Sequence, residues 1–279
     1  MALQHYFNGE WVPEEKLLIS ARDLSVVRGF GVFDFLRTYQ GKPFELEAHI
    51  DRFYRSAGYL ELPIPLDKHE LTTIVNEGIT RNSLPETGVR LTLTGGVASD
   101  AYAITPGKPS LIVSFGPIVS PEPRLYKTGG KVITTPHVRH IPQAKSLNYL
   151  VAVLAHREAK KVGAVEAVYM DAHSGRIYEG TIANLFVVQD GVVITPRDDV
   201  LIGMTRNVVL DLCKKLDIPS REENLYAKEL QHFQEMFITG TTKEVMPIVQ
   251  FDETTIGDGK VGPVTRRLVE AFGELIGRE

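Results

Sequence analysis

The chain lacks the features that define several classes of protein. Its one cysteine, Cys213, has no intrachain partner, and its place in an apolar helical stretch indicates core packing rather than a disulfide. No apolar run approaches the roughly 20 residues that are needed to span a bilayer. The first six residues lack a basic segment followed by an apolar core, so we expect no secretory export. These absences favour a reducing cytoplasm and give no membrane partner.

The chain also lacks a large excess of positive or negative charge. The net charge is −4 at neutral pH and no block of like charges occurs, which gives no support to nucleic acid as a partner. His137 and His140 are three residues apart, but no third ligand lies near them in the sequence, so we expect no metal site. The hydrophobic content of 43% and charged content of 24% are those of a globular protein with a buried core.

The length of 279 residues is sufficient for two domains of ordinary size. The segment Ser120-Pro-Glu-Pro-Arg124 is the best linker, because its two prolines disfavour helix and nothing in it requires burial. We therefore predict a small N-terminal α/β domain at residues 1–118, a linker at 119–124 and a large C-terminal domain at 125–279. Both parts mix strands with helices, so the predicted fold class is α+β.

Periodicity predicts the secondary structure of both parts. Apolar residues at three- and four-residue spacing predict helices at residues 46–59, 67–82, 146–162, 205–216 and 263–275. Alternation and turn signals predict strands at residues 32–39, 89–94, 110–115, 132–135, 166–170, 186–188 and 192–195. Asn8-Gly9, between apolar flanks, predicts a hairpin at the N-terminus.

Two segments point to a particular chemistry. Gln143-Ala-Lys145-Ser-Leu-Asn-Tyr149 places a lysine at the predicted start of a helix, and Glu179-Gly-Thr-Ile-Ala-Asn184 places a carboxylate where a strand is predicted to open. A pyridoxal phosphate enzyme needs one amine to hold the cofactor's aldehyde as a Schiff base. It also needs one carboxylate to keep the pyridine nitrogen protonated. Taken alone, a lysine at a helix start is most often a solvated surface charge.

Three further segments have the chemistry of a phosphate site. Arg52, on the predicted helix after His49, can form a bidentate pair with a phosphate. Leu201-Ile-Gly-Met-Thr205-Arg206 precedes a helix and offers free backbone N–H groups at its positive end. In Phe237-Ile-Thr-Gly-Thr241-Thr242 a strand breaks into hydroxyl residues at a glycine. Each has an ordinary alternative (an exposed arginine, a capped helix, a turn), but together and in this order they point to one site.

With these motifs in place, the chain resembles the fold-type IV aminotransferases. That group includes the branched-chain aminotransferases, the D-amino acid transaminases and aminodeoxychorismate lyase. The resemblance runs from Phe7-Asn-Gly-Glu-Trp-Val12 through Gly31-Val-Phe-Asp-Phe35 to Asp258-Gly-Lys-Val-Gly-Pro-Val-Thr265. It implies a two-domain fold with a cofactor cleft between the domains, pyridoxal 5'-phosphate as cofactor, amino acid and 2-oxo acid substrates, and a homodimer.

The resemblance also implies a role for each site residue. Lys145 corresponds to the Schiff-base lysine and, once freed, to the general base that moves the α-proton. Glu179 corresponds to the partner of the pyridine nitrogen, and Tyr149 to a tyrosine near the cofactor's phenolic oxygen. The positions that match the family's phosphate-binding residues are Arg52, Met204, Thr205, Thr241 and Thr242.

Substrate choice depends on two arginines. Alternation alone favours the wet face of a sheet for Arg90. The resemblance instead turns Arg28 and Arg90 toward the substrate, where they would hold the two carboxylates of glutamate or 2-oxoglutarate. Phe33 is expected to line the same cleft, with core packing a near-equal alternative. The loop at residues 95–104 lacks the Arg-x-His pair of the better-known D-amino acid transaminases.

These observations predict a D-amino acid transaminase that uses D-glutamate with 2-oxoglutarate or pyruvate as acceptor. In that case the arginine pair replaces the usual loop. An L-branched-chain aminotransferase is the first alternative, because it needs the same cofactor site. A lyase like the aminodeoxychorismate enzyme is less favoured, and a cofactor-binding scaffold without turnover is the least favoured.

Overall fold

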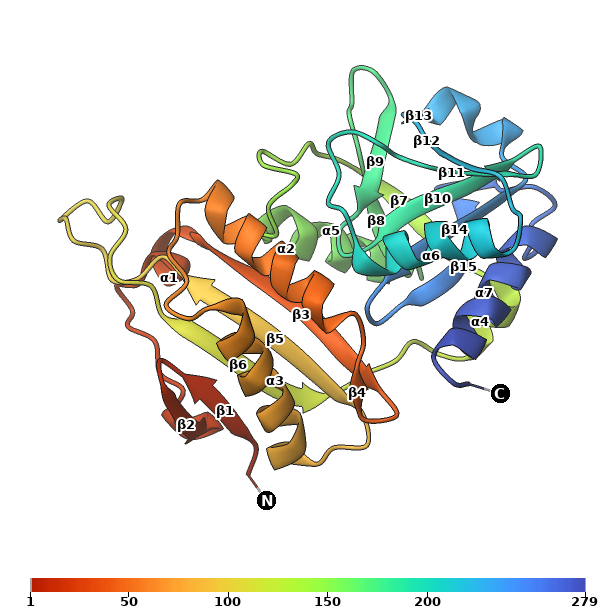
Figure 1. Cartoon of the computed structure of the whole chain (residues 1–279). Helices are drawn as coiled ribbons and strands as arrows, with labels where there is room; N and C mark the ends of the chain where they lie inside the picture. Colours follow the sequence, from red (N-terminus) through yellow and green to blue (C-terminus); the bar gives the residue numbers. More distant parts are fainter. Residues whose placement is uncertain (1, 279) are drawn as a thin grey trace. The chain divides into compact units, whose positions relative to one another are not determined.

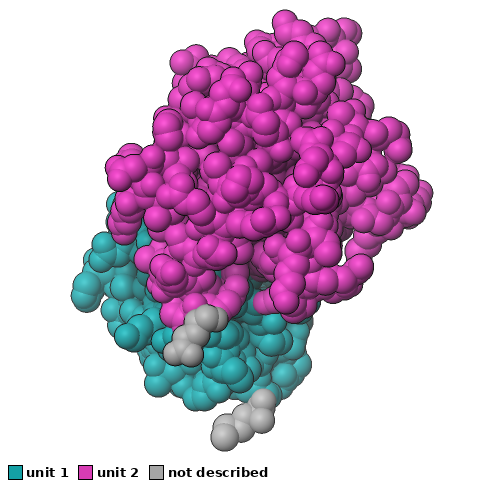
Figure 2. Space-filling model, turned by 90° about the vertical axis from the view of Figure 1, so that its right-hand side faces the viewer, with its two compact units in different colours: residues 1–119, 144–149 teal, residues 120–143, 150–279 magenta. Residues whose placement is uncertain are grey.

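The computed structural model describes residues 2–278, which form two compact units. The first unit comprises residues 1–119 and 144–149, and the second comprises residues 120–143 and 150–279; Figure 2 gives each its own colour. The chain leaves the first unit within the predicted linker at 119–124. The segment that carries Lys145, however, groups with the first unit, whereas the sequence prediction assigned it to the C-terminal domain.

The first unit is built on an antiparallel sheet in the strand order β2-β1-β6-β5-β3-β4. Its strands are β1 (Gln4–Phe7), β2 (Glu10–Pro13), β3 (Gly31–Tyr39), β4 (Lys42–Pro43), β5 (Thr87–Thr94) and β6 (Leu111–Pro117). Its helices are η1 (Glu14–Lys16), α1 (Leu24–Arg28), α2 (Leu46–Tyr59) and α3 (Lys68–Asn82). Figure 1 shows α2 and α3 lying across one face of this sheet.

The core of the first unit lies between that face and the two helices. On β5, the alternate residues Val89, Leu91 and Leu93 are fully buried, and they pack in one cluster with Ile50 and Phe53 of α2. Because side chains alternate along a strand, the residues between them point to the opposite face. That opposite face carries Phe33 and Arg90, whose strands pair side by side.

The second unit contains a ten-stranded mixed sheet in the order β12-β11-β10-β14-β15-β7-β8-β9-β13, with β16 paired to β15. Its strands are β7 (Gly130–Pro136), β8 (Glu166–Met170), β9 (Arg176–Gly180), β10 (Asn184–Gln189), β11 (Val192–Thr195), β12 (Ser220–Glu222), β13 (Leu225–Tyr226), β14 (Glu235–Gly240), β15 (Glu244–Phe251) and β16 (Thr254–Thr255). The pairs β15–β7, β7–β8 and β11–β12 are parallel.

Helices cover the second sheet. They are α4 (Arg124–Thr128), α5 (Leu150–Lys161), α6 (Met204–Lys215), η2 (Ala227–His232) and α7 (Pro263–Leu275). Helices α6 and α7 pack against β14 and β15, and α5 packs against β7 and β8. Among the described residues, no helix is both long enough and apolar enough to cross a membrane.

The structure confirms the predicted helices at 46–59 and 263–275 and the strand at 166–170, and it corrects two local predictions. Helix α5 begins at Leu150 instead of residue 146, so Lys145 does not lie at a helix start. Glu179 lies inside β9, whereas the sequence prediction placed it just before a strand. The first correction has a clear cause, because residues 145–147 hydrogen-bond to β3 and so cannot join the helix.

Candidate active site

Lys145 is held by its backbone against the edge of β3. The N–H of Phe33 donates to the carbonyl of Lys145 at 2.9 Å, and the N–H of Leu147 donates to the carbonyl of Gly31 at 2.9 Å. Ser146 forms an antiparallel bridge with Val32 between these two bonds. On the other side, the N–H of Lys145 donates to the hydroxyl of Ser56 on α2 at 3.0 Å. The lysine therefore sits on a short segment that an isolated bridge to β3 and a hydrogen bond to α2 hold in place.

Three of the predicted site residues gather around the ring of Phe33. The Lys145 amine lies 4.6 Å from the ring centroid and the Arg90 guanidinium carbon lies 3.9 Å from it. The ring of Tyr149 meets Phe33 edge-on at a centroid distance of 5.2 Å. Cations are attracted to the electron-rich face of an aromatic ring, so Phe33 helps to hold both charges. The structure thus brings Phe33, Arg90, Lys145 and Tyr149 together within one unit.

Arg90 lies on the face of the sheet opposite the two covering helices, and it is only half-exposed. Burial lowers the pKa of Arg90 from its ordinary value, whereas Tyr149 and Asp34 favour its charged form. An arginine keeps its charge in proteins even so. A partly desolvated guanidinium of this kind suits a carboxylate or phosphate.

Arg28 contacts a different part of the first unit. It ends helix α1, is exposed, and donates to the carbonyls of Val27 at 2.8 Å and Tyr102 at 3.1 Å. Tyr102 belongs to the loop that follows β5. These partners differ from the aromatic ring that Arg90 contacts, so a joint role of the two arginines in substrate binding stays a prediction.

Arg52 is buried on α2 in a cluster that the sequence analysis did not foresee. Its Nε and Nη2 donate to the two oxygens of Asp34, each at 2.8 Å, and Nδ1 of His49 lies 2.7 Å from Oδ1 of the same carboxylate. Burial alone would raise the pKa of Asp34, but Arg52 and His49 hold it well below its ordinary value. An acidic residue inside the apolar strand Gly31–Tyr39 was the available signal for this partner.

The cluster of Asp34, Arg52 and His49 should stabilise the fold less at low pH. The folded-state pKa of Asp34 lies below its unfolded value of about 3.9, so its stabilising effect is present above that pH and is lost as the pH falls below it. Asp34→Asn should therefore be less stable than the parent at pH 6. The difference between the two proteins in the free energy of unfolding should narrow steadily below pH 4. Urea unfolding from pH 6 to pH 3 measures this difference. A difference independent of pH would show that the charge of Asp34 is not what matters.

In the second unit, Glu179 is a buried carboxylate with three hydrogen-bond donors. The N–H of Leu201 donates to Oε2 at 3.0 Å, the amide of Asn184 donates to the same oxygen at 3.3 Å, and Arg139 donates to Oε1 at 3.0 Å. This donor set suits the ionised form, which only accepts hydrogen bonds. Asn184 stood in the motif that drew attention to Glu179. Arg139 carried no sequence signal, because its loop was considered only for its histidines.

The start of α6 and the end of β14 form a second polar group in the same unit. Gly203 precedes the helix and has no side chain to cap the N–H groups of its first turn, where Met204 and Thr205 are buried. A Cβ at Gly203 would lie 2.1 Å from Oδ1 of Asn184, so a larger residue there would displace the Asn184 amide. Thr239 pairs with Asn184 across β10 and β14, and its buried hydroxyl has no hydrogen-bond partner within residues 2–278.

Thr241 and Thr242 come shortly after Thr239, in the turn between β14 and β15, and both are half-buried. Uncapped N–H groups and an unpaired buried hydroxyl are unfavourable unless a ligand completes them. The N–H groups donate and a hydroxyl can also donate, so the ligand they suit is an anion.

Comparison with known proteins identifies the family. The model of the family described as amino-transferase class IV matches residues 31–251. The chain belongs to the class IV aminotransferases. It is 37% identical to a putative branched-chain-amino-acid aminotransferase of Methanocaldococcus jannaschii, over 97% of this chain and 95% of the relative. It is 33% identical to a D-alanine aminotransferase of Staphylococcus haemolyticus, over 97% of each.

Solved structures agree with this assignment. A T.th. branched-chain amino acid aminotransferase with pyridoxamine 5'-phosphate has a TM-score of 0.92 at 30% identity, covering 100% of this chain and 96% of that one. The Escherichia coli branched-chain enzyme has a TM-score of 0.91 at 28% identity, covering 99% and 95%. The fold is therefore that of a fold-type IV aminotransferase.

Class IV aminotransferases use pyridoxal phosphate, and the residues of each unit suit it. The second unit offers a carboxylate that accepts hydrogen bonds, for a protonated ring nitrogen, and uncapped N–H groups with an unpaired hydroxyl, for a phosphate. The first unit offers an amine beside an aromatic ring.

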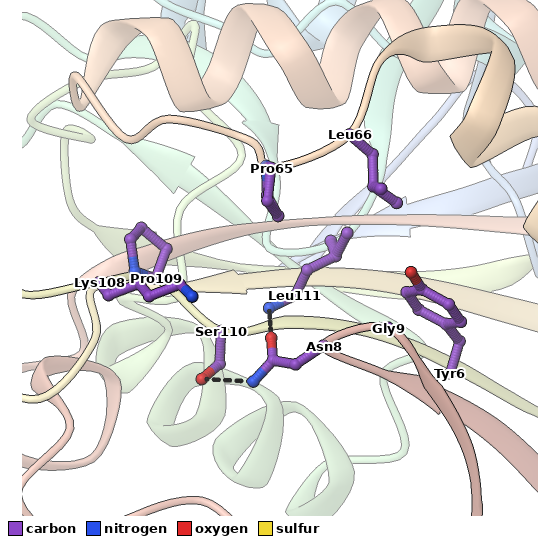
Figure 3. A pocket seen from close by; sticks show the side chains of 9 residues that line it. All are labelled: Tyr6, Asn8, Gly9, Pro65, Leu66, Lys108, Pro109, Ser110 and Leu111. Carbon is purple, nitrogen blue, oxygen red and sulfur yellow. Dashed lines mark hydrogen bonds between the residues drawn. The ribbon is translucent and has the colours of Figure 1, made fainter.

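A separate cavity of about 330 Å³ lies in the first unit (Figure 3). It is lined by Tyr6, Asn8, Gly9, Pro65, Leu66, Lys108, Pro109, Ser110 and Leu111. The Asn8 amide is already engaged, since it accepts from the N–H of Leu111 and donates to the hydroxyl of Ser110. None of the predicted site residues lines this cavity.

Proposed function

We propose that this class IV aminotransferase moves the amino group of a D-amino acid, with D-glutamate favoured, to a 2-oxo acid such as 2-oxoglutarate or pyruvate. The observation that supports it best is the half-buried Arg90, 3.9 Å from the ring of Phe33, with the Lys145 amine 4.6 Å from the same ring. A guanidinium beside the amine would hold a substrate carboxylate next to the reacting group. The 33% identity to a D-alanine aminotransferase adds support for D-substrates.

Every residue of the site has a task in this proposal. Bound pyridoxal phosphate supplies the electron sink that makes the substrate's Cα–H acidic. Lys145 would hold the cofactor and would move the proton from Cα, and Glu179 would keep the ring nitrogen protonated. Tyr149 would donate toward the cofactor's phenolic oxygen. The phosphate would be held by Arg52, Met204, Thr205, Thr241 and Thr242.

Arg52 brings its positive charge to this task already fixed in place. Asp34 engages its Nε and Nη2, so the guanidinium plane is oriented before any ligand arrives. A cation that is positioned in advance loses less conformational entropy when it binds an anion. This orientation supports a phosphate-binding role for Arg52.

In the proposal, Arg28 binds the second carboxylate of an acidic substrate. Its present partners are two backbone carbonyls on an exposed surface. Those carbonyls can be solvated by water when the guanidinium turns away, so the change costs little. An aliphatic side chain would gain nothing from Arg28, and for this reason an acidic substrate is favoured over a branched-chain one.

The alternative is an L-branched-chain aminotransferase. It is favoured by the 37% identity to the putative branched-chain enzyme of M. jannaschii and by the names of the similar solved structures. The two functions need the same cofactor residues. They differ in the configuration at the substrate's Cα and in the substrate side chain that the site accepts.

A half-reaction without acceptor separates the two. The purified holoenzyme is mixed with D-glutamate, L-glutamate or L-leucine in separate cuvettes, and the absorbance band of the bound cofactor is followed. Loss of the band with D-glutamate alone is the expected result. Loss with the L-acids instead would replace the proposal by the branched-chain alternative.

Substitution of the two arginines tests acidic-substrate binding. Arg28→Ala and Arg90→Met should each raise the KM for 2-oxoglutarate by about tenfold or more, because a charge-assisted hydrogen bond to a carboxylate is lost. The KM for pyruvate, which has one carboxylate, should respond to Arg90→Met more than to Arg28→Ala. Arg22→Ala, another exposed arginine of the first unit, is the matched control. An unchanged KM in Arg28→Ala would remove Arg28 from the substrate site.

A cytoplasmic homodimer completes the proposal, as the family resemblance implies. The chain has a mass of 31.0 kDa, so light scattering of the purified protein should give twice that value. A mass of one chain in the active enzyme would contradict the dimer.

A further inference from the structure

The loop at residues 196–203, between β11 and α6, carries two groups of the proposed cofactor site. Its Leu201 N–H donates to Glu179, and its last residue, Gly203, sets the first turn of α6. The carbonyl of Leu201 accepts from the amide of Asn184 at 2.7 Å. Any shift of this loop would therefore move the carboxylate's hydrogen-bond donor and the helix start together.

The loop contains no regular hydrogen-bonding ladder of its own. Asp199 adopts a left-handed conformation with φ at +62°, which costs free energy in a residue other than glycine. Irregular backbone of this kind keeps one conformation only where side chains satisfy its polar groups. The loop's position must therefore be set by contacts from neighbouring elements.

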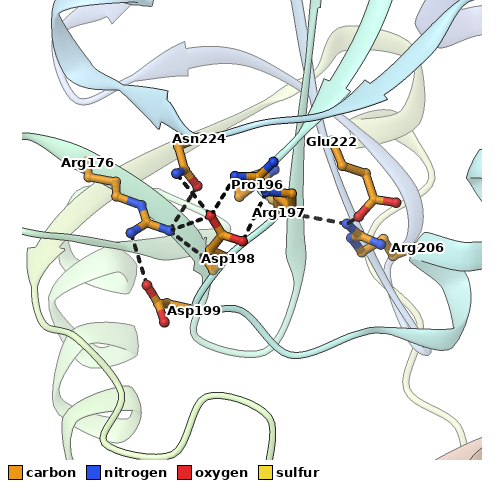
Figure 4. A network of polar contacts seen from close by, with 8 residues as sticks. All are labelled: Arg176, Pro196, Arg197, Asp198, Asp199, Arg206, Glu222 and Asn224. Carbon is orange, nitrogen blue, oxygen red and sulfur yellow. Dashed lines mark hydrogen bonds and ion pairs between the residues drawn. The ribbon is translucent and has the colours of Figure 1, made fainter.

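Arg176 supplies two of those hydrogen bonds (Figure 4). It lies on β9, three residues before Glu179. Its Nη1 donates to the carboxylate of Asp199 at 3.0 Å and its Nη2 donates to the carbonyl of Asp198 at 2.9 Å. Nη2 also donates to the amide oxygen of Asn224 at 2.9 Å, and the nitrogen of that amide returns to the carboxylate of Asp198 at 3.2 Å.

Arg206, on α6, holds the beginning of the same loop by a hydrogen bond. Its Nη2 donates to the carbonyl of Pro196 at 3.2 Å and pairs with the carboxylate of Glu222 at 2.6 Å. Only 2% of Arg206 is exposed, so the connection is rigidly packed. Two arginines therefore hold the first half of the loop, one from the strand of Glu179 and one from the helix that follows the loop.

We propose that Arg176 is a positioning residue for the cofactor. It touches neither Glu179 nor the first turn of α6, but it holds the loop that joins them, and so it keeps the ring-nitrogen partner and the phosphate site in register. This inference rests on the proposed cofactor-binding roles of Glu179 and the start of α6. Release of the loop should lower the affinity for a phosphate-bearing ligand more than the affinity for a phosphate-free one.

The test compares two ligands on full-length protein freed of cofactor. Arg176→Met and the parent are titrated with pyridoxal 5'-phosphate and with pyridoxal, which lacks the phosphate, by absorbance. The preference of the parent for the phosphorylated ligand should fall about tenfold in Arg176→Met, the size of one lost charge-assisted contact. Arg221→Met, which removes another arginine of the same unit that pairs with Glu223, should keep the parent's preference.

The outcomes separate this inference from the proposed site. If Arg176→Met weakens both ligands equally, or neither, the positioning role is overturned. If the parent itself shows no preference for the phosphorylated ligand, the proposed phosphate site fails, and the positioning role fails with it. A normal preference in the parent, lost in Thr205→Ala but retained in Arg176→Met, would keep the site and reject Arg176 alone.

Asp199→Asn provides a milder variant should Arg176→Met not fold. Asparagine tolerates the left-handed conformation at this position, so the variant removes the charge without adding backbone strain. We expect a smaller fall in the same preference, about threefold, since one of the three Arg176 contacts loses its charge. An unchanged preference in Asp199→Asn, together with a normal melting temperature, would contradict the inference.

Discussion

Lys145→Ala should lower the rate of transamination by about 10⁴-fold or more, because the substitution removes the proposed covalent attachment of the cofactor and the proposed base that moves the proton. The backbone bonds of residue 145 to Phe33 and Ser56 do not depend on the side chain, so the fold should survive. The measurements are the steady-state rate with D-glutamate and the absorbance of the bound cofactor. The absorbance band of the attached cofactor should be replaced by that of the free aldehyde.

Lys160→Ala is the matched control for this change. Lys160 is an exposed lysine on α5, and its loss should leave both the rate and the spectrum as in the parent. Retention of more than about one-hundredth of the parental rate in Lys145→Ala would assign the proton transfer to another residue.

Lys243→Met should destabilise the protein by about 3–5 kcal/mol, because it leaves the carboxylate of Glu166 buried without its counter-ion. Glu166 is fully buried and Lys243 is 7% exposed, and their charged atoms lie 2.6 Å apart. The lysine also donates to the carbonyl of Val165 at 2.9 Å, and Glu166 accepts from Thr181 and from the N–H of Ala167. The free energy of unfolding in urea measures the loss.

The double variant Lys243→Met/Glu166→Gln tests the cause. It removes both charges, so much of the lost stability should return, whereas independent effects would add. Lys161→Met breaks an exposed pair with Glu158 and should change stability by less than about 1 kcal/mol. Equal losses in the buried and exposed variants would mean that burial of the pair contributes nothing.

The buried pair also bears on the cofactor site. Glu166 starts β8, Thr181 follows Glu179 by two residues, and Lys243 closes the turn that contains Thr241. Released from this pair, the turn should hold a phosphate less firmly. A higher dissociation constant for the cofactor in Lys243→Met would accompany the loss of stability.

Local signals in the sequence were enough to predict much of the fold. Alternation on Val89, Leu91 and Leu93 predicted a half-buried strand, and the structure confirms it with one face in the core. The amphipathic spacing in residues 46–59 likewise predicted α2 at its observed bounds. In both cases the pattern of burial along one element decides the conformation. Residues that are adjacent in the sequence carry that pattern.

The errors arise where residues that are distant in the sequence determine the backbone conformation or the ion-pair partner. The apolar spacing after Lys145 favoured helix, but hydrogen bonds to β3 hold residues 145–147 extended until α5 starts at Leu150. Asp34 and Arg139 were missed as partners of Arg52 and Glu179 for the same reason. A charge pair across two elements leaves no periodicity in the sequence, and only the folded chain shows which charges meet.

The pairing of Ser146 with Val32 has a consequence for the order of assembly. Residues 1–119 can form their sheet as soon as they leave the ribosome, yet the edge of β3 at Gly31–Phe33 stays open until residues 145–147 have been made. Contacts between residues so far apart in the sequence form slowly, because a long loop must close first. The Lys145 amine is therefore one of the last groups of the first unit to reach its place, and a nascent chain lacks the proposed site until synthesis has passed into the second unit.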